Sequence, residues 1–274
     1  MQLKLSRHLW GVEETWEDVF PRIKANGYSI IECPLPDKAE HVRFRALLDQ
    51  YGFDYIPLIF TSGTSVNEHV DAFRSQIALS ESLRPYMINS HSGFDGWDDD
   101  SSSRFFEQAL ALEEALSVPV SHETHRGRIL YNPWVTSRML ERFPNLKLCC
   151  DFSHWVCVCE RLLDSETDII QQAAEHCIHL HVRVGYEEGP QVPDPRAPEY
   201  ESHLNAHERW WKMVWDAQLA RNQQVSTLTA EYGPPLYLHT MPHSQTPAAN
   251  LWEVCEWQAQ REAARFKEFF GKDP

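Results

Sequence analysis

The chain repeats one pattern eight times: a short apolar run of strand length, then a longer stretch whose apolar residues have helical spacing. The apolar runs occupy 3–10, 28–34, 54–61, 86–93, 118–125, 146–154, 178–184 and 226–233. The helical stretches occupy 13–26, 38–50, 65–83, 102–116, 134–143, 165–176, 199–221 and 249–270. Such runs are too apolar to face water on either side, so they predict a parallel sheet covered by helices. Eight repeats predict closure into a single α/β domain, a (β/α)8 TIM barrel.

An open, doubly wound α/β sheet is the alternative architecture. The chain lacks the G-x-G-x-x-G and Walker loops that often accompany such a sheet. It also contains no low-complexity linker, so we predict one domain over 1–274, with the helix 249–270 packed on the barrel. The longest irregular stretch, 186–198, is rich in proline, and a loop of this length inside a compact domain is usually functional.

The charge balance narrows the classes of partner. The chain has 40 acidic and 25 basic residues and a formal net charge of −15, which repels phosphate backbones. No apolar run approaches the roughly 20 residues that cross a bilayer, and the opening MQLKLSRHLWGVEE does not resemble a secretory leader. The odd number of cysteines, seven, predicts reduced thiols. We therefore expect a cytoplasmic protein with no nucleic-acid and no membrane partner.

Nearly every predicted strand ends in an ionisable side chain. In chain order these are His8, Glu32, His91, Glu123, Asp151, His154, His181, Arg183 and Glu231. The carboxyl ends of barrel strands meet at one mouth, where so many charges cannot be buried together without compensation. A divalent cation removes this conflict, and three carboxylates with one imidazole suit Mn²⁺, Mg²⁺, Co²⁺ or Zn²⁺. The predicted ligands, one from each of the last four strands, are Glu123, Asp151, His181 and Glu231.

Each of these residues also has a structural alternative. A carboxylate such as Asp151 caps a helix in many proteins. His179 and His181 lie two apart on a strand and face the same side, so one of them is expected to be a packed core histidine. Glu32 has Arg7 as an alternative ion-pair partner. Three tryptophans that follow predicted strands either wall a sugar pocket or pack in the core; these are Trp97, Trp134 and Trp155.

Four motifs resemble the xylose isomerase-like barrel superfamily: SHETHRGR, DFSHW, HLHVRVG and TAEYGPP. This superfamily includes sugar phosphate isomerases and epimerases, hydroxypyruvate isomerase, inosose dehydratase and endonuclease IV of AP endonuclease family 2. In the epimerases a metal is held by Glu, Asp, His and Glu in that order, which the four predicted ligands match. The resemblance further implies that His154 contacts substrate and that Arg183 fills the polar position after the ligand histidine. The loop GPQVPDPR departs from the P-G-R-H-E-P type of that group.

The resemblance implies an isomerase or epimerase that moves a proton next to a carbonyl through a metal-stabilised enediolate. Glu123 and Glu231 would act as the catalytic acid and base on a carbohydrate, with one divalent metal ion, Mn²⁺ as first expectation. Further substrate contacts are expected from His91, His125, Arg126 and Trp155. Arg126 and Arg128 are either ligands for a phosphate or carboxylate or ordinary surface residues.

Three other functions remain as alternatives. The same residues suit a lyase or dehydratase acting on a keto-sugar, because water elimination uses the same chemistry with a general acid. An endonuclease IV-like phosphodiesterase requires a histidine after the third strand and a D-x-H motif, where this chain has IFTSG and Asp194-Pro195-Arg196. A sugar-binding barrel without catalysis is the third. The superfamily resemblance also implies a homo-oligomer, a dimer or tetramer.

Overall fold

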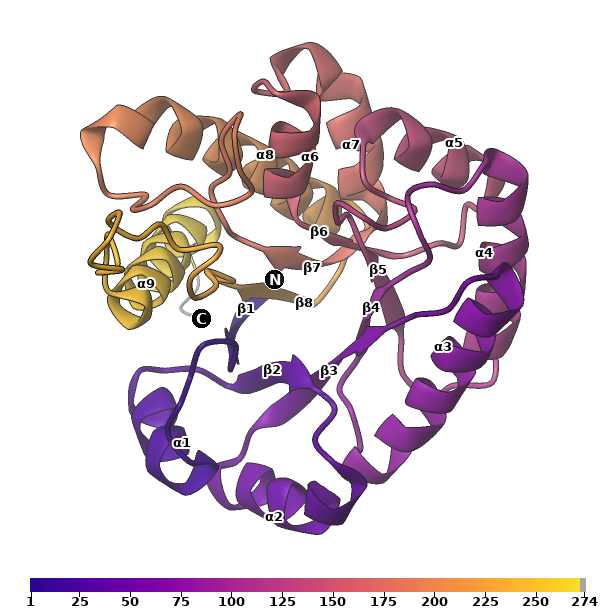
Figure 1. Ribbon diagram of the computed structural model, residues 1–274, viewed down its shortest axis with the longest axis horizontal. Helices are drawn as coiled ribbons and strands as arrows, with labels where there is room; N and C mark the ends of the chain where they lie inside the picture. Colours follow the sequence, from indigo (N-terminus) through magenta and orange to yellow (C-terminus); the bar gives the residue numbers. More distant parts are fainter. Residues whose placement is uncertain (272–274) are drawn as a thin grey trace.

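The computed structural model describes residues 1–271. Eight parallel strands form a closed barrel in sequence order, with β1 hydrogen-bonded to both β2 and β8 (Figure 1). The strands are β1 (Gln2–His8), β2 (Ile30–Pro34), β3 (Asp54–Phe60), β4 (Ile88–His91), β5 (Val120–Glu123), β6 (Leu148–Cys150), β7 (Cys177–His181) and β8 (Val225–Thr229). Closure is set by the register that pairs Gln2 of β1 with Val225 of β8. The predicted single-domain (β/α)8 architecture is confirmed.

Helices surround the barrel on its outer face (Figure 1). They are α1 (Trp16–Ala25), α2 (His41–Tyr51), α3 (Val66–Ser80), α4 (Asp99–Glu113), α5 (Pro133–Arg142), α6 (Phe152–Cys159), α7 (Thr167–His176), α8 (Glu201–Ala220) and α9 (Leu251–Phe270). Four 3₁₀ turns extend or precede helices: Lys38–Glu40, Glu81–Leu83, Asp164–Glu166 and Pro198–Tyr200. The helix α9 packs against β1, where the Cys255 thiol lies 3.6 Å from Nε2 of His8.

Local sequence signals explain where several helices begin and end. Thr15, Ser65 and Asn132 precede α1, α3 and α5, and each side chain accepts a hydrogen bond from the backbone N–H three residues on. The helices α2 and α9 end at Gly52 and Gly271, which adopt φ of +63° and +65°. Glycine adopts this left-handed conformation without steric strain, so it ends a helix readily.

The expected strand over 146–154 is wrong in its second half. The strand β6 ends at Cys150, and α6 begins at Phe152. Asp151 lies between them in extended conformation, and its side chain accepts from the backbone N–H of Ser153. The aspartate therefore caps the helix and turns the chain directly from strand to helix. Hydrophobicity alone does not report this turn, because residues 152–158 are as apolar as the strand before them.

The interior of the barrel changes character along its axis. A small apolar cluster of Ile30, Ile56 and Met87 fills it near the amino ends of the strands. Two residues further along β2 and β4, on the same face, come the buried polar side chains Glu32 and Asn89. The amino end of the interior is thus apolar, and the next layer toward the mouth is polar. All seven cysteines are free thiols, and within residues 1–271 no helix has the length and apolar character to span a membrane.

Candidate metal centre

The four predicted ligands converge at the mouth of the barrel. Glu123 ends β5, Asp151 follows β6, His181 ends β7, and Glu231 lies two residues beyond β8. All four are buried, and one ligand atom from each lies within 4.8 Å of the others. We call this group the ligand tetrad. Its members come from four adjacent strands, so the barrel itself places them.

Unpartnered polar atoms face one another inside the tetrad. Nδ1 of His181 lies 3.6 Å from Oε2 of Glu123 and 3.3 Å from Oε2 of Glu231. Within the described chain, neither this Nδ1 nor Oε1 of Glu123 has a hydrogen-bond partner, although both are buried. A buried polar atom without a partner destabilises the fold by about 1–3 kcal/mol. A cation at this position would satisfy both atoms, so the donor set fits a divalent metal.

Glu32 holds the imidazole of His181 in this orientation. Its Oε1 lies 3.1 Å from Nε2 of His181, and its Oε2 lies 3.3 Å from Nε2 of His179. The Thr229 hydroxyl and the Asn89 amide also donate to this carboxylate. A metal-binding histidine commonly donates its second ring N–H to such a carboxylate, which leaves the first nitrogen free for the metal. The alternative pairing of Glu32 with Arg7 is not formed, because the Arg7 guanidinium packs over the Trp252 ring of α9.

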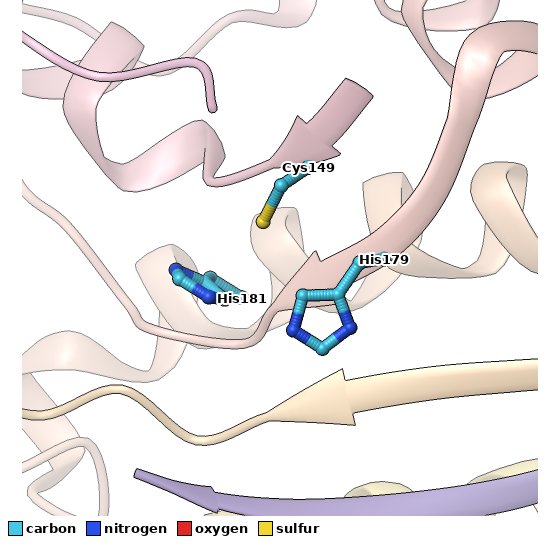
Figure 2. A group of neighbouring side chains, drawn as sticks. All are labelled: Cys149, His179 and His181. Carbon is cyan, nitrogen blue, oxygen red and sulfur yellow. The ribbon is translucent and has the colours of Figure 1, made fainter. Parts of the chain in front are cut away.

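Figure 2 shows Cys149 of β6 with His179 and His181 of β7, their side chains directed toward one another. Both nitrogens of His179 have partners, since Nδ1 lies 2.7 Å from the Thr227 hydroxyl and Nε2 contacts Glu32. His179 is therefore the packed core histidine of the pair, and His181 is the one with a free nitrogen. Burial raises the pKa of the Cys149 thiol well above its usual value, so the thiol is neutral.

Arg183 is a buried cation beside the tetrad. Its Nη2 lies 2.5 Å from Oδ2 of Asp151, and its Nη1 lies 3.1 Å from Oε2 of Glu231. Burial raises the pKa of Asp151 to about 6, although the guanidinium acts in the opposite direction. Three carboxylates next to one guanidinium leave two negative charges. A divalent ion would neutralise these charges, which is a second reason why the site fits one.

Charge also fixes the proton that His181 carries when no metal is bound. Burial lowers the pKa of this imidazole, but the neighbouring Cys149 thiol and the carboxylates of Glu231, Glu32 and Glu123 together raise it well above 6.5. The carboxyl pKa of Glu123 is lowered well below its usual value, because His91 and His181 outweigh the effect of burial. A proton on His181 therefore takes the place that a cation would occupy.

A cavity of about 600 Å³ opens beside the tetrad and exposes part of it to ligands. Its polar lining consists of His91, His125, Arg128, Arg183 and Glu231. The His91 and His125 rings lie 4.5 Å apart, and Nε2 of His91 lies 2.9 Å from Oε2 of Glu123. Burial lowers the pKa of His125 to about 3, so that imidazole is neutral. His91, His125 and Arg183, which are three of the expected substrate contacts, thus line this cavity.

Three other predicted contacts do not line this cavity. His154 is fully buried, with its ring 3.9 Å from that of His125 and its Nε2 2.7 Å from Nη2 of Arg183. Arg126 is exposed and lies over the Tyr237 ring at 5.1 Å. Trp155 belongs to the hydrophobic core, and its indole N–H donates to the Leu130 carbonyl. The expectation that Trp155 contacts substrate is therefore wrong, because it faces the helical layer from the first turn of α6.

The structure also places the two other tryptophans and the proline-rich loop that the sequence singled out. Trp97 packs edge-on against His69 and Trp134 lies on the outer surface of α5, so neither lines the cavity. The proline-rich loop 186–198 packs on the segment after β8, where Gln191 exchanges two hydrogen bonds with the Gly233 backbone. Several lining residues were not identified as site residues from the sequence: Leu9, Trp10, Cys33, Leu58, Phe60 and Tyr237.

Comparison with known proteins agrees with this architecture. The profile of the xylose isomerase-like TIM barrel family matches residues 20–208. The chain belongs to this family, as its motifs indicated. No curated protein sequence matched it.

Solved structures share the fold at low identity. The probable 3-DHS dehydratase AsbF of Bacillus anthracis has a TM-score of 0.63 and 13% identity, with 94% of this chain and 97% of that chain covered. Endonuclease IV of Thermus thermophilus has a TM-score of 0.61 and 13% identity, covering 97% and 99%. A sugar phosphate isomerase/epimerase of Parabacteroides distasonis has a TM-score of 0.60 and 10% identity, covering 94% and 92%. Proteins of different activity thus share this barrel, so the activity has to be argued from the site.

Proposed function

We propose that the protein is a divalent-metal-dependent sugar isomerase or epimerase that transfers a proton at the carbon next to a carbonyl. The observation that carries this proposal is the pair of unpartnered buried atoms, Nδ1 of His181 and Oε1 of Glu123, inside a tetrad that borders a ligand-sized cavity. Glu123, Asp151, His181 and Glu231 would hold the ion. When bound, the ion would polarise the substrate carbonyl and so acidify the neighbouring C–H bond.

The two glutamates are the proposed acid and base. Glu231 lines the cavity and is the carboxylate best exposed to a substrate. Glu123 lies beside His181 and accepts a 2.9 Å hydrogen bond from Nδ2 of Asn89, which fixes its orientation. One glutamate removes the proton from carbon, and the other, or the same one, returns it. Return to the opposite face gives an epimer, and return to the neighbouring carbon gives an isomer.

Three cavity side chains would bind substrate oxygens. The Arg183 guanidinium is fixed by Asp151, Glu231 and the Glu231 carbonyl, so it presents a positive charge in a set direction. His91 and His125 line the same cavity, and His91 lies beside Glu123. Fixed charges and dipoles of this kind stabilise the negative charge that develops on oxygen as the proton leaves carbon.

The test is metal content per chain by elemental analysis, on wild type and on Glu231→Gln. We expect about one divalent ion in wild type, a lower content in the variant, and loss of turnover on ketoses and keto-sugars without loss of fold. Glu262→Gln is the matched control, because Glu262 is a buried carboxyl on α9 that belongs neither to the tetrad nor to the cavity lining. A metal-free wild type, or full activity in Glu231→Gln, would contradict the proposal. Two or three zinc ions would favour a phosphodiesterase.

A further inference from the structure

The cavity beside the tetrad has two chemically different sides. Its imidazole and charged side chains lie at or beyond the ends of β4, β5, β7 and β8; they are His91, His125, Arg128, Arg183 and Glu231. The side formed by β1, β2 and β3 is lined by Leu9, Trp10, Gly11, Cys33, Pro34, Leu58 and Phe60. We call these seven residues the apolar wall. Among the described residues of this wall there is no charged side chain, carboxamide or hydroxyl.

The apolar wall is held in place by the surrounding structure. A Cβ added at Gly233 would meet the Trp10 ring at 2.3 Å, so the indole lies directly on the backbone after β8. Tyr237 packs edge-on against the same ring at 4.8 Å between centroids. The Tyr237 ring in turn lies 5.2 Å from the guanidinium carbon of Arg183. Contacts on two sides therefore fix the orientation of Trp10, which is exposed on its remaining side.

A free sugar suits this wall poorly. A hydroxyl buried without a hydrogen-bond partner is unfavourable, because it loses its hydrogen bonds to water. Among its side chains, the wall offers only the indole N–H of Trp10 and the Cys33 thiol, and burial raises the pKa of that thiol to about 12, so it is neutral. An apolar group on the same wall releases water and gains about 25 cal/mol for each Å² of apolar surface buried.

We propose that the substrate has an oxygenated head, a carbonyl beside a hydroxyl, joined to an apolar aryl or alkyl body. The head lies at Glu231, Arg183 and the tetrad, and the body lies on the apolar wall between Trp10, Leu58 and Phe60. This inference rests on the proposed function for the head and on the cavity lining for the body. It narrows the substrate class to hydroxy-carbonyl compounds with an apolar substituent, such as a keto-sugar that carries an aryl or alkyl group.

The binding of two small acids tests the head and the body of the proposed substrate separately. Glycolate and mandelate are both 2-hydroxy carboxylates that present adjacent oxygens, and mandelate differs by a phenyl ring. Binding of each to the Mn²⁺-loaded protein is measured by titration calorimetry, which requires no turnover. We expect mandelate to bind at least about tenfold more tightly, because burial of a phenyl group is favourable by that factor or more.

Two variants test whether the apolar wall causes the preference for mandelate over glycolate. Phe60→Ala removes a wall ring and should reduce the mandelate-to-glycolate ratio several-fold, while Phe94→Ala removes an exposed ring outside the cavity and should keep it. Equal affinity for the two acids, or an unchanged ratio in Phe60→Ala, would overturn the inference and leave the proposed function intact. Binding of neither acid would instead overturn the placement of the head, and with it both proposals.

Discussion

Nε2 of His181 lies 3.1 Å from Oε1 of Glu32, so a carboxylate from β2 reaches across the barrel interior to orient a ligand on β7. Glu32→Gln removes the charge that holds the imidazole, and we expect metal affinity to fall about 10- to 100-fold. The chain supplies a matched control in Glu113, which lies 2.8 Å from Nε2 of His122 on the outside of the barrel. Glu113→Gln should leave metal affinity unchanged. Competition with a metallochromic chelator measures both, and equal affinity in the two variants would refute the role of Glu32.

Metal affinity should rise with pH, because protons and the cation compete for the same atoms. His181, whose pKa is raised by neighbouring carboxylates, has to release a proton to bind metal. Asp151, with a pKa of about 6, has to release another below that pH. Affinity should therefore increase about tenfold per pH unit just above pH 6 and more steeply below it. Calorimetry in buffers of different ionisation enthalpy counts the released protons. Affinity that does not vary between pH 5 and 7 would contradict these assignments.

Metal removal should lower thermal stability. A ligand at 100 times its dissociation constant stabilises the folded state by about 2.7 kcal/mol if it does not bind the unfolded chain. For a domain of this size we expect the midpoint temperature of thermal unfolding to rise by several degrees when Mn²⁺ is added to chelator-treated protein. Scanning fluorimetry measures the change. Glu231→Gln should lose most of this increase and Glu262→Gln should retain it, whereas equal increases in both variants would place the ion elsewhere.

Trp155 should contribute to stability and not to metal or ligand binding. It is fully buried, and its indole N–H lies 3.0 Å from the Leu130 carbonyl. Trp155→Ala should lower the free energy of unfolding by about 3–5 kcal/mol, and Trp155→Phe by less, since much of the volume is kept. Urea unfolding gives these values. Loss of metal binding or of glycolate binding in folded Trp155→Phe protein would show that Trp155 contributes to the site, against this prediction.

The repeated pattern was sufficient to predict the fold and the tetrad. Eight apolar runs give eight strands, and a closed parallel barrel brings the ends of β5, β6, β7 and β8 to one place, so Glu123 and His181 were predictable neighbours. The direction of individual side chains was not predictable. Trp155 and His154 follow the same strand as Asp151, but they belong to α6, whose start depends on one capping hydrogen bond.

The apolar half of the cavity could not be predicted from the sequence, for a different reason. Leu58 and Phe60 belong to an apolar strand, and such residues look the same in sequence whether they face a core or a cavity. Tyr237 lies in a loop with no strand or helix of its own, so neither period nor spacing placed it beside Trp10. Only the three-dimensional arrangement shows that these residues share a surface.

The division of the mouth between two sets of strands makes this barrel a favourable starting point for engineering. Every member of the tetrad lies on or after β5 to β8, while the apolar wall comes from β1 to β3. A library confined to Leu9, Leu58 and Phe60 would therefore vary which molecules are accepted without altering a single proposed metal ligand. Selection on such a library would change the substrate and keep the chemistry.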